Sequence, residues 1–217
     1  MTIATTLVNL EGRVLLKNVS WDTYDRLLAD LGDQRNIRLH YDRGFLEIMT
    51  PLLEHENPKR ILEKTIDSLA DVLDWEVLSA GSTTLKRKDL ERGSEPDSGF
   101  YIQNEQQVKG KRTIDLPNDP PPDLIIEVDV TSSSVNREAI YGAMGVPEIW
   151  RCDRGVVTFL QLQDGNYIEI DRSIAFPILP ASKATEILEQ SQTVGETTLF
   201  REFRRWVTAQ LETEGSS

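Results

Sequence analysis

The segment DLIIEVDV (123–130) constrains the fold more than any other part of the sequence. Its middle is apolar at consecutive positions, as in a strand that is covered on both faces. A hydroxyl-rich stretch then leads to Asn136, a good N-cap, and to a helix that is predicted to end at about Met144, before Gly145. The next strand begins at Pro147. This order of strand, helix and strand predicts a crossover within a mixed α/β sheet.

Further elements are predicted on both sides of this crossover. Before it we expect a helix capped by Ser20, a hairpin of strands at 36–41 and 45–50, a longer helix capped by Asn57 and opened by Pro58, and extended stretches at 75–79, 82–86 and 98–102. Residues 103–122 form a long connection without an element of its own. After the crossover we expect a second hairpin at 156–162 and 166–170, and helices at about 183–190 and 197–211.

The sequence therefore predicts an α/β (α+β) fold with a mixed central sheet flanked by helices. An N-terminal helix and hairpin precede the core, and a C-terminal hairpin and helices follow it. We expect one domain over residues 1–211, with its core at about 45–155 and a disordered tail at 212–217.

Acidic side chains stand in the apolar strand at 123–130. Because side chains alternate along a strand, Asp123, Glu127 and Asp129 share one face. A buried carboxylate without a partner is costly, and a divalent cation is one suitable partner. Asp97 begins the neighbouring strand, so Asp97 and Glu127 can converge on one ion if the two strands pair. A structural ion-pair network with Arg137 explains the acids equally well.

The charge of the chain argues against a general nucleic-acid binder. Its net charge is −12, from 36 acidic and 24 basic residues, whereas affinity for nucleic acid rests on neutralising phosphates. Any such contact must come from local basic clusters, although most clusters of this kind are solvated surface. The candidates are Lys59-Arg60, Lys86-Arg87-Lys88, Lys109 with Lys111-Arg112, and Arg201 with Arg204-Arg205.

The same composition indicates a cytoplasmic protein with no membrane partner. Cys152 is the only cysteine, so no internal disulfide can form, which is typical of a reducing compartment. No run approaches the roughly 18 apolar residues that a membrane span needs. The N-terminus also lacks the basic start and apolar stretch of a signal peptide.

Several motifs occur together and in order between about residues 20 and 162. They are YDRGFLEIMTP (41–51), Glu54-His55-Glu56, Pro96-Asp97, PDLIIEV (122–128) and GVPEIW (145–150). In this combination the chain resembles the Uma family of putative restriction endonucleases, especially its cyanobacterial version. That family is similar to the PD-(D/E)xK nuclease superfamily, which implies a restriction-endonuclease-like core of a helix, a mixed sheet and a crossover helix.

The resemblance implies roles for individual residues. Asp97 matches the aspartate of the PD element and Glu127 the acid of the (D/E)xK element, so both are expected to bind Mg²⁺ or Mn²⁺. Asp129 stands where the superfamily has lysine. The family often places that lysine on the following helix, four residues before a tyrosine, and counting back from Tyr141 gives Arg137. Arginine keeps the charge of lysine but cannot act as a base.

Other family positions carry weaker expectations. Glu47 is placed to add to the metal shell, and His55 to contact phosphate, to order water or to serve a structural role. Tyr141 supports Arg137 or fills the core, and we favour the core. Glu148 and Trp150 are expected to pack the start of the strand after the helix rather than to take part in chemistry.

Two functions follow from the resemblance. The first is a Mg²⁺-dependent endonuclease that hydrolyses phosphodiester bonds in DNA, expected as a homodimer for symmetric duplex cutting. The alternative is a catalytically impaired nuclease-fold protein that acts as a binding or interaction module, which the acidic charge, Asp129 and Arg137 favour. A hydrolase that uses a hydroxyl of residues 131–134 with His55 is disfavoured, because the nucleophile-elbow glycines are missing.

Overall fold

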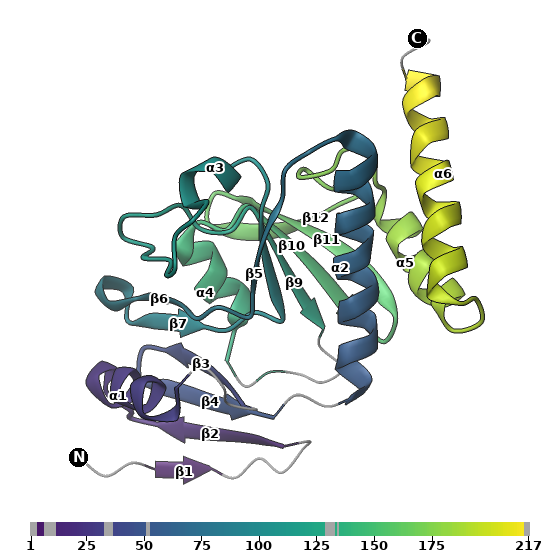
Figure 1. The fold of residues 1–217 in the computed structure, drawn as a ribbon. Coiled ribbons are helices and arrows are strands. Elements are labelled where there is room, and N and C mark those ends of the chain that lie inside the picture. The colour runs from purple at the N-terminus through teal and green to yellow at the C-terminus, as the bar shows by residue number, and fades with distance from the viewer. Residues whose placement is uncertain are drawn as a thin grey trace.

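The structure, a computed structural model, describes residues 4–6, 12–32, 37–50, 53–128, 133 and 135–214. Within these ranges the strands form two six-stranded sheets. The order β1-β2-β4-β3-β7-β6 defines the N-terminal sheet, and the order β12-β11-β10-β9-β8-β5 defines the central sheet. Figure 1 shows the N-terminal sheet and α1 at one end of the molecule and the helices α2, α5 and α6 along the central sheet.

The N-terminal sheet is built mainly from the first fifty residues. Its elements are β1 (Ala4–Thr6), β2 (Arg13–Lys17), α1 (Trp21–Leu31), β3 (Arg38–Asp42), β4 (Phe45–Met49), β6 (Leu85–Arg87) and β7 (Arg92–Ser94). A short 3-10 turn, η1 (Lys88–Leu90), joins β6 to β7. Ser20 caps α1 by accepting a hydrogen bond from the Thr23 amide at 3.2 Å. The helix then packs Tyr24 and Leu28 into the core of this sheet.

The central sheet is mixed, as the sequence predicts. It contains β5 (Leu78–Gly81), β8 (Ser98–Tyr101), β9 (Leu124–Val128), β10 (Glu148–Asp153), β11 (Val156–Gln163) and β12 (Asn166–Ile170). The strands β9 and β10 are parallel, and α4 (Arg137–Met144) lies between them in the chain, whereas β8 pairs antiparallel with β9. Asn136 caps α4 through the Ala139 amide, and Gly145 ends it in the left-handed region at φ 82°.

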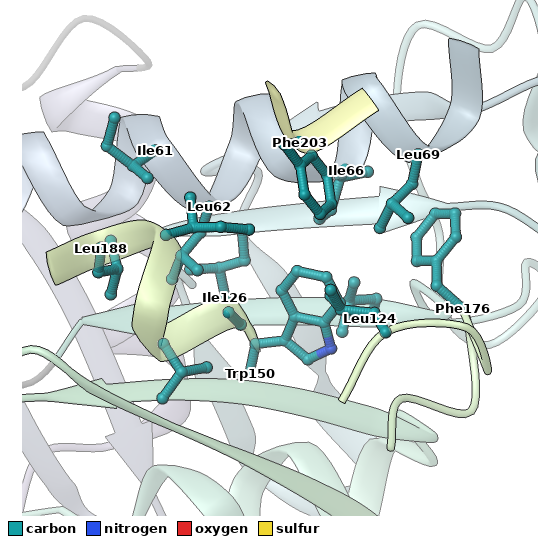
Figure 2. Packing of buried hydrophobic residues seen from close by; sticks show 14 of the residues in the cluster. Ile61, Leu62, Ile66, Leu69, Leu124, Ile126, Trp150, Phe176, Leu188 and Phe203 are labelled. Carbon is teal, nitrogen blue, oxygen red and sulfur yellow. The ribbon is translucent and has the colours of Figure 1, made fainter. Parts of the chain in front are cut away.

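Helices cover the two faces of the central sheet. On one face, α2 (Leu53–Leu73), α5 (Ala181–Ser191) and α6 (Glu196–Glu214) bury a core around Trp150. Figure 2 shows Leu62 and Leu69 of α2 above the strands that carry Ile126 and Trp150. On the other face, α4 contributes Ile140 and Met144 to a second core. No helix in the described ranges is both long and apolar enough to cross a membrane.

The predicted elements are found within a few residues of their expected bounds, with three kinds of exception. The strands β1, β2 and β7 and the short helix α3 (Glu105–Val108) were not predicted. The prediction that Pro58 opens its helix is wrong, because α2 begins at Leu53 and contains Pro58. A proline one turn into a helix removes only one early backbone hydrogen bond, so the turn before it can still form. The last helix reaches Glu214, three residues into the predicted tail, and residues 215–217 lie outside the described ranges.

Gly93 of β7 lies directly against the ring of Tyr24 in α1. A Cβ atom at this position would stand 2.2 Å from Tyr24 Oη and 2.7 Å from Cζ. Tyr24 is fully buried and stacks on Tyr41 with ring centroids 4.8 Å apart, so it has little room to move. We expect Gly93→Ala to lower the free energy of unfolding by about 1–3 kcal/mol, measured by urea denaturation.

Gly99 of β8 provides the matched control for this substitution. It is also a strand glycine, but an added Cβ would meet Pro122 Cγ at 3.5 Å, an ordinary van der Waals contact. We expect Gly99→Ala to change the free energy of unfolding by less than about 1 kcal/mol. Equal effects of the two substitutions would contradict the steric explanation.

Candidate active site

Buried charged and polar side chains gather where the N-terminal sheet meets the central sheet. The chain passes from β7 to β8 at this point, so residues 95–97 lie between the two sheets. The strands β2, β3 and β4 contribute side chains from one side, and β9 and α4 from the other. The buried members of this cluster are Arg13, Arg38, His40, Glu47, Ser94, Glu95, Asp97, Glu127, Arg137 and Tyr141.

Asp97 and Glu127 come together on adjacent strands. The strands β8 and β9 pair antiparallel with Ser98 opposite Ile126, so Asp97 and Glu127 follow at the next position of the ladder. Residues opposite each other in such a ladder project to the same face. The Oδ2 atom of Asp97 accepts a hydrogen bond from the Val128 amide at 2.7 Å, which fixes its carboxylate beside β9. The strand pairing on which the approach of Asp97 to Glu127 depends is therefore present.

Each of the two carboxylates also contacts a guanidinium group. Arg38 Nη1 lies 3.2 Å from Asp97 Oδ1, and Arg137 Nη1 donates to Glu127 Oε2. Tyr141 Oη donates to Glu127 Oε1 at 2.5 Å. Every oxygen of the pair thus contacts at least one donor among the described residues, and a carboxylate oxygen has a second lone pair that can accept a further ligand.

Burial shifts the pKa values of Glu127 and its neighbour Tyr141. The pKa of Glu127 is raised to about 7, because burial and the negative charge of Asp97 raise it by more than the positive charge of Arg137 lowers it. Burial also raises the pKa of Tyr141 well above its usual value, so the phenol keeps its proton and donates it in a hydrogen bond. The negative charge of Asp97 therefore opposes the ionisation of Glu127.

A second line of polar contacts leads away from Glu127 into the N-terminal sheet. Ser94 Oγ donates to Tyr141 Oη at 2.8 Å, and His40 Nδ1 lies 2.7 Å from Ser94 Oγ. Burial, followed by the positive charges of Arg137, Arg38 and Arg13, lowers the pKa of His40 well below its usual value. The imidazole is therefore neutral at physiological pH.

The other residues predicted from the sequence are Glu47, His55, Asp129 and Tyr141. Glu47 is fully buried in the same cluster, where its Oε1 accepts from Ser133 Oγ at 2.8 Å and lies 3.5 Å from Arg13 Nη1. His55 belongs to α2, but its side chain lies outside the described part of the structure, and so does Asp129. Tyr141 packs in the core as favoured, and its hydroxyl also binds Glu127.

Arg38, His40 and Ser94 were missed by the sequence analysis. A weak signal was present for the first two, because Arg38 and His40 alternate with Leu39 and Tyr41 in a predicted strand. Two polar side chains on one face of a strand that is buried on both sides call for partners. Ser94 carried no such signal, because β7 was not predicted.

The described residues offer a pair of acids rather than a complete metal cage. Among the described side chains, no three His, Cys, Asp or Glu groups are placed to hold a metal ion together. Magnesium nevertheless keeps several waters and often binds through one or two carboxylates with substrate phosphates. The carboxylate oxygens of Asp97 and Glu127 are the ligand type that fits an ion of this kind.

A groove opens beside the cluster. It has a volume of about 1170 Å³ and is lined by Arg38 and Glu95 of the cluster together with Thr50, Thr84, Lys86 and Arg112, among others. Arg38 therefore faces the groove and contacts Asp97 as well. Asp97 and Glu127 do not line the groove themselves, so Arg38 is the residue that connects it to the buried pair.

A family model decides the relationship of the chain to known proteins. The model of Uma2, described as "Putative restriction endonuclease", matches residues 21–195. The chain belongs to the Uma2 family. The resemblance found in the sequence motifs is therefore confirmed over most of the chain.

A solved structure supports the fold of this Uma2 member. The crystal structure of a putative nuclease belonging to DUF820 from Anabaena variabilis superposes with a TM-score of 0.51 at 12% sequence identity. The match covers 78% of this chain and 99% of that one. At this identity the likeness shows a shared fold alone. No curated protein matches the chain.

Proposed function

We propose that the chain is a divalent-metal-dependent endonuclease that hydrolyses phosphodiester bonds in DNA. The observation that carries the proposal is the buried pair Asp97 and Glu127 on adjacent strands of a Uma2 fold. In this proposal the two carboxylates hold Mg²⁺ or Mn²⁺. Among the described residues each of their oxygens contacts one donor, which leaves a lone pair for an ion and supports this assignment.

The residues of the chain supply the electrostatic part of the mechanism. A bound divalent ion would polarise the phosphodiester and favour ionisation of an attacking water. Arg38 orients Asp97, and Arg137 with Tyr141 orients Glu127. Arg137 keeps its positive charge at all relevant pH values, so it stabilises negative charge at the phosphorus centre but does not accept the proton of the water.

The groove beside Arg38 is the proposed path of the DNA backbone. Its cationic residues are Arg38, Lys86 and Arg112, and its acidic residues are Asp25, Glu56 and Glu95. Because these charges balance, we expect weak and salt-sensitive binding of DNA without metal. This agrees with the net charge of −12.

The proposal is tested by cleavage of DNA with the purified protein. Supercoiled and linear duplexes and a single strand are incubated with Mg²⁺ or Mn²⁺, and parallel samples contain a chelator. We expect cleavage that requires the metal and returns when excess metal is added to the chelated sample. A protein that binds no Mn²⁺ by calorimetry and cuts none of these substrates would rule out the nuclease proposal.

The second candidate is a nuclease-fold protein that acts as a binding or interaction module. Arg137 favours it, because this residue occupies the lysine-related position and already neutralises Glu127. Normal Mn²⁺ binding without cleavage, unchanged in Arg137→Lys, would favour the module and would exclude the missing lysine as the reason for inactivity. Analytical ultracentrifugation tests the associated proposal that a homodimer forms for symmetric cutting.

A further inference from the structure

Four side chains form a continuous hydrogen-bonded chain across the two sheets. It begins at His40 in β3 and passes through Ser94 in β7 and Tyr141 in α4 to Glu127 in β9. The successive distances are 2.7 Å, 2.8 Å and 2.5 Å. All four side chains are buried, so bulk water does not compete for these contacts.

The direction of each hydrogen bond follows from the number of protons available. In its ionised form, which predominates above pH 7, Glu127 only accepts, so the single hydroxyl proton of Tyr141 is donated to it. Tyr141 can then only accept from Ser94, whose own proton is used in that bond. Ser94 therefore accepts from His40, which requires the proton of the neutral imidazole to be on Nδ1.

The other ring nitrogen of His40 agrees with this direction. Its Nε2 atom is buried and has no hydrogen-bond partner among the described residues. The positive charges of Arg13, Arg38 and Arg137 act on this imidazole. A bare lone pair is favoured over an N–H group in such surroundings, because its partial negative charge is attracted to the guanidinium groups.

We propose that His40 is a positioning residue for Glu127, acting through the hydroxyls of Ser94 and Tyr141. An Nδ1–H imidazole donates to Ser94, so Ser94 donates to Tyr141 and the Tyr141 proton is left to point at Oε1 of Glu127. Hydrogen bonds that run in one direction also strengthen one another. The catalytic consequence rests on the proposed nuclease function, whereas the hydrogen-bonded chain can be tested without it.

The proposal is read out directly by determining which ring nitrogen of His40 carries the proton. The sequence contains only two histidines, and the signal that is absent from His40→Asn belongs to His40. Nitrogen-15 NMR of the imidazoles distinguishes a protonated from a bare ring nitrogen. In wild-type protein held well above pH 7, where Glu127 with its pKa of about 7 is ionised, we expect Nδ1–H, and an Nε2–H tautomer under these conditions would overturn the proposal.

Glu127→Gln tests the coupling over three hydrogen bonds. Arg137 only donates, so the new amide oxygen should turn toward Arg137 and the NH₂ group toward Tyr141. Tyr141 must then donate to Ser94, and Ser94 must donate to His40, which moves the imidazole proton to Nε2. An unchanged tautomer in folded Glu127→Gln would contradict the coupling.

Two tyrosine variants provide an independent test and its control. Tyr141→Phe removes the acceptor of Ser94, which frees the serine proton for His40 Nδ1, so we again expect a shift toward Nε2–H. Tyr167→Phe removes a hydroxyl that donates to the Val146 carbonyl at 2.7 Å and is not part of the hydrogen-bonded series from His40 to Glu127. We therefore expect no change in the tautomer of His40. Equal tautomers in the two variants would show that the contacts are only packing. Circular dichroism verifies that each variant is folded.

The catalytic consequence is tested with two substitutions of His40. We expect His40→Leu to lower the kcat for DNA cleavage about tenfold with little change in KM, as for other residues that orient metal ligands. His40→Asn retains an amide donor near the Nδ1 position and should recover most of the rate. Full activity of folded His40→Leu would refute the positioning role. If the wild-type protein cuts no DNA, the nuclease proposal fails and the tautomer measurements still decide the structural coupling.

Discussion

Asp97→Asn and Glu127→Gln are each expected to reduce metal-dependent DNA cleavage by about a thousandfold. Either substitution keeps the shape of a buried side chain but removes one of the two carboxylates that are proposed to hold the ion. A catalytic metal contributes several kcal/mol of transition-state stabilisation. Since about 1.36 kcal/mol corresponds to a tenfold change in rate, the loss of about 4 kcal/mol gives the stated effect.

Single-turnover cleavage with saturating Mg²⁺ measures this effect. Asp123→Asn is the matched control, because Asp123 is a buried acid that directly precedes β9, the strand of Glu127. Its Oδ2 atom accepts from the Ile102 and Asn104 amides. We expect the activity per folded molecule of this control to stay within about threefold of wild type. Full activity of both Asp97→Asn and Glu127→Gln would remove these residues from the active site.

The stability of these variants needs to be measured alongside their activity. Asp97 is the partner of the buried Arg38, and removing one member of a buried ion pair can cost about 3–5 kcal/mol. Thermal unfolding in the absence of metal separates this loss of stability from the loss of catalysis. Cleavage by each variant is then compared with that by the wild-type protein only at temperatures where both are folded.

Local patterns in the sequence were sufficient to predict the part of the fold that carries the acidic pair. The apolar run at 124–128, the cap Asn136 and the terminating Gly145 define a strand and a helix by short-range chemistry. The crossover then follows because parallel strands need a long connection. The approach of Asp97 to Glu127 could be inferred from the sequence because Asp97 directly precedes one recognisable strand and Glu127 lies near the end of another.

The rest of the site depends on contacts that no local pattern contains. His40 and Ser94 are 54 residues apart, and they meet because β3 pairs with the unpredicted strand β7. Glu47 was expected near the metal, and its contacts with Arg13 and Ser133 could not be inferred without β2. The roles of Asp129 and His55 stay predictions. Pro58 shows a related limit, since a single residue preference does not fix the start of a helix.

Trp150→Ala is expected to lower the free energy of unfolding by about 3–5 kcal/mol. Trp150 is fully buried at the centre of the core between the central sheet and the helices (Figure 2). Its ring stacks on Phe159 with centroids 4.7 Å apart and meets the edge of Phe176 at 6.4 Å. Its Nε1–H also donates to Glu148 Oε1 at 2.8 Å, so truncation leaves both a cavity and a buried acceptor without this donor.

Two further tryptophan substitutions separate the contributions to this loss. Trp150→Phe keeps an aromatic ring but removes the donor to Glu148, and we expect an intermediate loss of about 1–3 kcal/mol. Trp75→Ala removes a 42% exposed ring that stacks on the same Phe176, and we expect at most about 1 kcal/mol. Urea denaturation measures each difference from the midpoint at constant m. If Trp150→Ala were no more destabilising than Trp75→Ala, the core around Trp150 would not be the main source of stability for the sheet that carries Glu127.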